Sequence, residues 1–220
     1  MSQGVDITKS LPLAWSSYIA GQPVKSDDML EVRYPWDGSL TGTLSKINSE
    51  QLEQAIQAAL DNKEMPTKNE RYEILMRARD LLAMHADEFA NLIRLEAGLC
   101  MRETRYEVGR AQEVFKFAAA EALRDDESIF SCDAAKNGPA RKIFTLREPL
   151  SLVVAITPFN HPLNQVAHKL APAIAAGVPV LLKPSSKTPL TAIRLTELLY
   201  EAGLPKPMLS TFVGDRKTIT

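Results

Sequence analysis

The chain has little cysteine and little histidine: two cysteines and three histidines occur among its 220 residues. Cys100 and Cys132 cannot form a disulfide framework of the kind found in small secreted domains, and no group of Cys and His residues has the spacing of metal ligands. We therefore expect no metal site. The composition alone leaves each cysteine open as a structural residue or as a nucleophile.

Long apolar runs and a marked excess of charge are also absent. No hydrophobic stretch approaches the roughly 20 residues of a membrane-spanning helix, and the first residues lack the basic and apolar pattern of a signal peptide. The formal net charge of -1 gives no general attraction to nucleic acid or to a membrane surface. The sequence therefore predicts neither a nucleic-acid partner nor a membrane partner, and the cytoplasm is the expected compartment.

Hydrophobic residues make up 45% of the chain and charged residues 24%, which is enough apolar material for a core in one or one and a half domains. Short strands are expected at 18–24 and 30–44, where turn residues interrupt the apolar pattern. Apolar residues at helical spacing predict four helices, at about 49–60, from 68 onward, 86–97 and 102–123. Gly98 is expected to end the third of these helices.

A strand, a helix and a second strand follow one another in the last third of the chain. Leu152–Ile156 is a short apolar run stopped by Pro158, and Val178–Leu182 is a similar run stopped by Pro184. The segment between them, Leu163–Ala176, has a helical pattern with a glycine just past its end. Such a unit predicts two parallel strands joined by a right-handed crossover.

Polar residues follow both predicted strands. Neighbouring parallel strands lie about 4.8 Å apart and point the same way, so residues 157–160 and 183–186 should emerge together at the carboxyl edge of the sheet. Open α/β sheets bind their ligands at that edge. The Asn160 amide and the Lys183 ammonium would together suit an anionic or charge-developing ligand. The alternative is that these two residues merely solvate strand ends.

Several segments resemble consecutive signatures of the aldehyde dehydrogenase superfamily. The specific ones are Ile156–Asn164, Ala167–Gly177, Leu182–Ser185 with Thr188–Pro189, and Glu201–Pro205; weaker likenesses occur at Tyr18–Val24, Tyr34–Gly38 and Leu95–Gly98. The resemblance covers about 15–214. It implies an α/β fold with a Rossmann-like parallel sheet, flanking helices and a small β bridging arm, which together form an incomplete aldehyde dehydrogenase fold.

The resemblance also implies a division of the chain and a missing remainder. Residues 1–126 would form the first strands and helices of the nucleotide-binding domain, 127–149 the bridging arm, and 150–220 the first Rossmann-like part. The family's nucleophilic Cys and general-base Glu match no motif in these residues, so we expect the 220-residue piece alone to be inactive. Because the arm of such proteins pairs with another subunit, a homodimer or homotetramer is expected.

Site roles follow from the family by position. Asn160 would donate its side-chain amide to the oxyanion that forms when the family's Cys adds to an aldehyde, before hydride passes to NAD or NADP and water releases the acid. The cofactor would be bound by Ile156, Thr157, Pro158, Phe159, Lys183, Ser185, Ser186 and Gly214.

The choice between NAD and NADP depends on one position three residues after Lys183. NAD-selective members commonly have a Glu there, whose carboxylate repels a 2′-phosphate, whereas this sequence has Ser186 followed by Lys187. A hydroxyl in place of a carboxylate removes that repulsion, so NADP should be tolerated alongside NAD. Alternatively, Ser186 is neutral and Lys187 only a surface residue.

Two residues indicate the substrate. His161 follows the oxyanion Asn, and Arg110 lies on the long helix that borders the family's substrate tunnel, one turn beyond Tyr106. An Arg and a His in one cavity favour an aldehyde with an anionic group. The run from residue 96 to 110 resembles the phosphonoacetaldehyde dehydrogenase branch. Alternatively, Arg110 pairs with Glu107 or Glu113 on its own helix, and His161 is an ordinary polar wall residue.

Two other functions stay open at this point. One is an acylating relative that passes the acyl group to coenzyme A, or a reductive one, and either would lack the general-base Glu. The other is a non-catalytic segment that binds nucleotide, or binds a partner through the arm.

Overall fold

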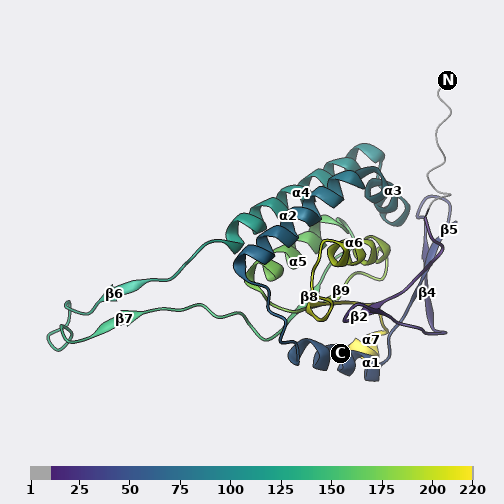
Figure 1. Cartoon of the computed structure of the whole chain (residues 1–220). Coiled ribbons are helices and arrows are strands. Elements are labelled where there is room, and N and C mark those ends of the chain that lie inside the picture. The colour runs from purple at the N-terminus through teal and green to yellow at the C-terminus, as the bar shows by residue number, and fades with distance from the viewer. Residues whose placement is uncertain (1–10, 220) are drawn as a thin grey trace.

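The computed structural model describes residues 11–219, and its centre is the predicted strand–helix–strand unit (Figure 1). Strand β8 (Val153–Ile156) leads through helix α5 (Asn164–Ala176) to β9 (Val180–Lys183). Helix α6 (Leu190–Glu201) and the short helix η2 (Lys206–Met208) then lead to β10 (Leu209–Thr211). The three strands are parallel in the order β10-β9-β8, which confirms the predicted α/β fold class.

An N-terminal hairpin completes this sheet on the side away from β8. Strands β2 (Tyr18–Ile19) and β3 (Gln22–Pro23) pair with each other, and β2 lies antiparallel to β10 with Tyr18 opposite Thr211. The sheet therefore has five strands in the order β3-β2-β10-β9-β8. The hairpin was expected from the sequence, but its place at the edge of the parallel sheet was not.

Helices cover the sheet on two faces (Figure 1). On one face, Val180 and Leu182 belong to the core that also contains buried residues of α2 (Lys68–Met84), α4 (Met101–Ala122), α5 and α6. On the other face, Leu181 packs with Ala55 and Ala59 of α1 (Ser49–Leu60). The alternation follows from the two-residue period of a strand, and it makes β9 apolar on both faces.

The helix ends are set by local sequence signals. Asn48 and Thr67 form capping boxes at the starts of α1 and α2, each with the residue three positions on. Gly98 and Gly177 adopt the left-handed conformation just past α3 (Ala86–Ala97) and α5, with φ of 72° and 77°. The four predicted N-terminal helices are therefore confirmed to within a residue or two. The last helix, α7 (Arg216–Ile219), is a single turn.

A second sheet lies beside the first. Its strands β1 (Ala14–Trp15), β5 (Leu40–Ser45) and β4 (Met29–Arg33) are ordered β1-β5-β4, with β1 parallel and β4 antiparallel to β5. Its core joins Trp15, Val32 and Leu44 to Leu92 of α3 and Ile193 of α6.

Residues 127–149 form a long arm that extends away from the rest of the molecule (Figure 1). Strands β6 (Ile129–Ser131) and β7 (Lys142–Phe144) pair antiparallel, and both faces of the pair are exposed. The side chain of Ile129 is 85% exposed and that of Phe144 68% exposed. The pairing joins Ile129 to Phe144 and Ser131 to Lys142.

Candidate functional site

Three loops meet at the carboxyl edge of the parallel strands. Ile156 at the end of β8 lies opposite Lys183 at the end of β9, and the Thr157 amide donates to the Lys183 carbonyl at 3.3 Å. Thr211 of β10 lies opposite Leu182, so Gly214 follows three residues past the same edge. The structure thus places the loops of Asn160, Lys183 and Gly214 at one rim, hereafter the strand-end rim, as the strand order predicts.

Side chains at the strand-end rim are open to solvent. Asn160 lies four residues beyond β8 and is exposed, Ile156 and Phe159 are 62% and 51% exposed, and Lys183 is half-buried. The Lys187 Nζ lies 4.6 Å from the centre of the Phe159 ring, which is a cation–π distance. Lys187 is exposed, and this contact joins the loop after β9 to the loop after β8.

Two buried hydroxyls near the strand-end rim have no hydrogen-bond partner within residues 11–219. They belong to Thr157, after β8, and to Thr188, which precedes α6 and was given no site role from the sequence. Thr157 and Thr188 are 5% and 2% exposed. A buried hydroxyl without a partner is costly, so both oxygens suit a polar ligand at this rim.

The Glu107 side chain of α4 accepts hydrogen bonds from the start of α5. Its carboxylate is 2% exposed, and its Oε1 accepts from the backbone amides of Leu163 and Asn164, both at 2.9 Å. The first amides of a helix have no partner within the helix, and a carboxylate there also meets the positive end of the helix dipole. Glu107 therefore fixes the helix that follows the Asn160 loop.

Glu96 of α3 does the same at the start of α6. It accepts from the Leu190 and Thr191 amides and from the Thr191 hydroxyl, with Thr191 N at 2.9 Å. Burial of this carboxyl raises the pKa of Glu96 to about 7, against the opposite effect of those hydrogen bonds. Both crossover helices are thus anchored by a buried glutamate of the helical layer, a feature that no local sequence signal identifies.

The two predicted substrate residues do not lie together as expected. Arg110 lines a groove of about 480 Å³ between α4 and α5, hereafter the α4–α5 groove, whose other lining residues include Tyr106, Asn164 and His168. His161 does not line it; its Nδ1 lies 3.4 Å from Glu107 Oε2. His168 of α5 lines the groove in the place expected for His161.

Arg110 itself has no salt bridge to any residue in the described range 11–219, so the proposed pairing with Glu107 or Glu113 does not occur there. Glu113 instead pairs with Lys116 at 3.3 Å. An unpaired guanidinium on the wall of a groove is available to an anionic ligand.

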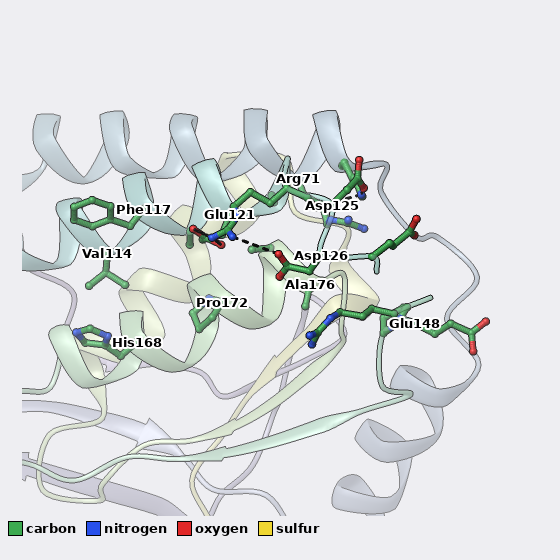
Figure 2. A pocket seen from close by; sticks show the side chains of 18 residues that line it. Arg71, Val114, Phe117, Glu121, Asp125, Asp126, Glu148, His168, Pro172 and Ala176 are labelled. Atoms are coloured by element: carbon green, nitrogen blue, oxygen red, sulfur yellow. Dashed lines mark hydrogen bonds and ion pairs between the residues drawn. The ribbon is translucent and has the colours of Figure 1, made fainter. Parts of the chain in front are cut away.

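A larger cavity of about 740 Å³ continues from this groove toward the root of the arm (Figure 2). Figure 2 shows Val114 and Phe117 of α4 opposite His168 of α5, and these three residues line both spaces. Its far end is mixed in charge, with the Arg124–Asp126 ion pair at 3.4 Å. None of its charged residues was singled out from the sequence.

Within the described part of the chain, no helix has both the length and the apolar composition to cross a membrane. The same residues contain no group of three or more His, Cys, Asp or Glu side chains that could hold a metal ion.

Comparison with known proteins gives a consistent result. The model of a family described as "Aldehyde dehydrogenase family" matches residues 23–220. A 3-sulfolactaldehyde dehydrogenase of Priestia aryabhattai is 39% identical over 199 residues, which are 90% of this chain and 42% of that protein.

Two solved structures share the fold. Aldehyde dehydrogenase 21 of Physcomitrella patens, in complex with the reaction product succinate, is 29% identical with a TM-score of 0.89 and matches 95% of this chain and 44% of its own. The NADP-dependent glyceraldehyde-3-phosphate dehydrogenase of Bacillus halodurans, complexed with NADP, is 29% identical with a TM-score of 0.89, over 94% of this chain and 45% of its own. The chain thus spans less than half the length of these relatives, and none of the three is a phosphonoacetaldehyde dehydrogenase.

Proposed function

The chain belongs to the aldehyde dehydrogenase family, and from this premise we propose that the complete protein oxidises a small anionic aldehyde to a carboxylate with NAD or NADP. "Complete protein" here means a polypeptide that contains these residues at the length of the relatives. The observation that carries the proposal is the meeting of the Asn160, Lys183 and Gly214 loops at the strand-end rim.

Asn160 is the proposed oxyanion donor. Its side chain is exposed beyond β8, on a loop whose far end is fixed by Glu107 through the Leu163 and Asn164 amides. A preorganised amide of this kind stabilises the negative charge that develops on an aldehyde oxygen when a nucleophile adds to its carbon. Losing one such donor raises the activation free energy of the reaction by about 2.7–4 kcal/mol.

The dinucleotide is proposed to bind at the strand-end rim. Ile156, Thr157, Pro158 and Phe159 after β8 would contact it on one side, and Lys183, Ser185, Ser186 and Gly214 on the other. The unpartnered buried hydroxyls of Thr157 and Thr188 fit a polar ligand there. When bound, NAD or NADP supplies the hydride acceptor. The residues named above would position it at the ends of the strands.

NADP is proposed to be accepted as well as NAD. Ser186 and Lys187 are exposed at the strand-end rim, and neither contributes a carboxylate that would repel a 2′-phosphate. The solved relative from Bacillus halodurans is complexed with NADP, which is consistent with this choice of cofactor.

The anionic group of the substrate is proposed to meet Arg110 in the α4–α5 groove. Arg110 is exposed there and has no salt bridge within residues 11–219, and a guanidinium can bind a sulfonate, carboxylate or phosphate through two parallel hydrogen bonds. The names of the relatives include a sulfonated aldehyde, a carboxylate product and a phosphorylated aldehyde. Phosphonoacetaldehyde belongs to the same chemical class and stays a prediction. His161, held beside Glu107, is proposed to shape the wall near Asn160.

The nucleophile and the general base are proposed to lie outside these 220 residues. Cys100 is the N-cap residue just before α4 and Cys132 lies in the arm, so neither belongs to the loops of the strand-end rim. The exposed arm is proposed to pair with a second subunit in a homodimer or homotetramer, since its apolar residues have no partner in the described part of the chain.

The test compares 3-sulfolactaldehyde with lactaldehyde, which differ by the sulfonate. In the complete protein, Arg110→Ala should lower kcat/KM for the sulfonated aldehyde by about 10- to 100-fold, the worth of charged hydrogen bonds, and change lactaldehyde little. Arg102→Ala is the matched control, because Arg102 lies on the same helix, pairs with Glu103 and does not line the α4–α5 groove. Equal losses of kcat/KM for both aldehydes would contradict the proposal that Arg110 binds the anionic group of the substrate.

A further inference from the structure

We propose that Lys187 is a positioning residue for the oxyanion donor Asn160, and that it acts through the ring of the preceding residue, Phe159. This inference rests on the proposed function, because it concerns how the same donor is aimed. It gives the loop after β9 a role in the reaction in addition to the cofactor contacts proposed for it.

The segment 158–160, which ends in Asn160, forms no hydrogen bond to any residue in the range 11–219. Just before the segment, the Thr157 amide donates to β9 at 3.3 Å, and just after it the His161 carbonyl accepts from α5 at 3.0 Å. The backbone between these two hydrogen bonds is therefore not fixed by bonds of its own. The direction of the Asn160 side chain depends on side-chain contacts of the segment.

The Phe159 ring supplies such a contact. The Lys187 Nζ lies 4.6 Å from the centre of the ring, within the distance of about 6 Å at which an ammonium group is attracted to the face of an aromatic ring. Phe159 remains 51% exposed beside this ammonium group. The ring can therefore contact Lys187 and a dinucleotide at the same time.

The backbone of Lys187 is fixed by its neighbours. Its amide donates to the Ser185 hydroxyl at 3.3 Å, and the Thr188 amide donates to the Ser185 carbonyl at 3.1 Å, so Lys187 lies in a hydrogen-bonded turn. Two residues further on, Glu96 accepts from the first amides of α6. The ammonium group is thus presented from a fixed turn, and its attraction to the ring restrains Phe159.

Asn160 directly follows Phe159, so a restrained ring limits where the Asn160 amide can point. A donor stabilises an oxyanion only while it is aimed at it, and misplacement lowers the rate. Without the contact, the segment would also occupy positions in which the amide is turned away. The expected effect is that of one exposed cation–π contact, about 2- to 5-fold in kcat.

The experiment uses the complete protein, 3-sulfolactaldehyde and saturating NAD, which has no 2′-phosphate to pair with Lys187. Lys187→Met keeps the length of the side chain and removes its charge. It should lower kcat by about 2- to 5-fold while the KM for the aldehyde and the Kd for NAD stay unchanged, because the aimed amide acts in the transition state. Lys187→Arg keeps a cation that stacks on aromatic rings, so it should retain kcat.

Phe159→Leu shows whether the ring transmits the effect. In the Phe159→Leu protein, Lys187→Met should lower kcat no further, since no ring is left to restrain. Equal losses with and without the ring would show that the ammonium group acts directly through its charge, and would overturn the positioning role. Lys116→Met is the matched control, because Lys116 lies 5.9 Å from the Phe117 ring on α4, outside the loops of the strand-end rim; it should leave kcat unchanged.

The outcomes separate the two proposals. An unchanged kcat in Lys187→Met, or an equal fall in Lys187→Arg, overturns the positioning role of Lys187 while Asn160 still stands as the donor. Undiminished turnover in Asn160→Ala, or no NAD-dependent turnover in the unmodified protein, overturns the proposed function itself and this inference with it.

Discussion

Replacing Glu107 should destabilise the protein far more than an ordinary change on the same helix. Glu107→Ala removes the acceptor of two backbone amides, those of Leu163 and Asn164, each held at 2.9 Å in an environment where the carboxylate is 2% exposed. A hydrogen bond to a charged group contributes about 1.5–3 kcal/mol, so the free energy of unfolding should fall by about 3–6 kcal/mol.

Glu107→Gln removes the negative charge of the side chain but keeps its size and its Oε1 acceptor. Both amides contact the same oxygen, Oε1, which a glutamine retains, while its NH₂ group would face His161 in place of Oε2. Because bonds to a neutral acceptor are roughly half as strong, the loss should be about half of that for alanine.

The assay is urea unfolding of the complete protein followed by circular dichroism. Glu103→Ala is the control, since Glu103 lies one turn earlier on α4 and forms only an exposed pair with Arg102; it should change the free energy by no more than about 0.5 kcal/mol. A loss below about 1 kcal/mol for Glu107→Ala would refute the reasoning that this carboxylate fixes the start of α5.

Two further changes test the electrostatics of the site. Burial raises the pKa of Glu96 to about 7, above the ordinary 4.5, so between these pH values the folded state keeps the proton and the unfolded chain releases it. The stability that this difference leaves in place below pH 4.5 is therefore lost as the pH rises to 7. In urea titrations at pH 4.5 and 7.5, Glu96→Gln should remove about 3 kcal/mol of the decline in the free energy of unfolding between these two pH values. An unchanged decline would contradict the raised pKa of Glu96. Ser186→Glu should shift the ratio of kcat/KM values toward NAD by at least about 10-fold through repulsion of the 2′-phosphate, and an unchanged ratio would remove Ser186 from the cofactor site.

The strand–helix–strand unit could be predicted because its signals are local. Short β-branched runs, the prolines that stop them and the glycine after α5 fix the elements in sequence order. Parallel pairing then follows from the length of the crossover, which brings the Asn160 and Lys183 loops to one edge without any knowledge of side-chain contacts.

The anchoring glutamates could not be predicted, because each acts over a long sequence distance. Glu96 contacts residues 94 and 95 positions away, and Glu107 contacts residues 56 and 57 positions away. The sequence pattern of their own helices indicates only ordinary polar residues at both positions. Their partners are backbone amides, which have no signature in a sequence.

The lining of the α4–α5 groove could be predicted only in part. Helical spacing places Tyr106 and Arg110 on one side of α4, and both line the groove. Which residues of α5 face them depends on how that helix is rotated, and Glu107 fixes that rotation through the first amides of α5. As a result Asn164 and His168 line the groove, while His161 lies against Glu107.

The most direct test of the strand-end rim as an aldehyde dehydrogenase site is Asn160→Asp in the complete protein, which keeps the size of the side chain and removes the amide donor. Turnover of an anionic aldehyde should fall by about 100- to 1,000-fold, while the Kd for NADP, measured by titration, should change less than about two-fold. Undiminished turnover would contradict the proposed role of Asn160 as the oxyanion donor.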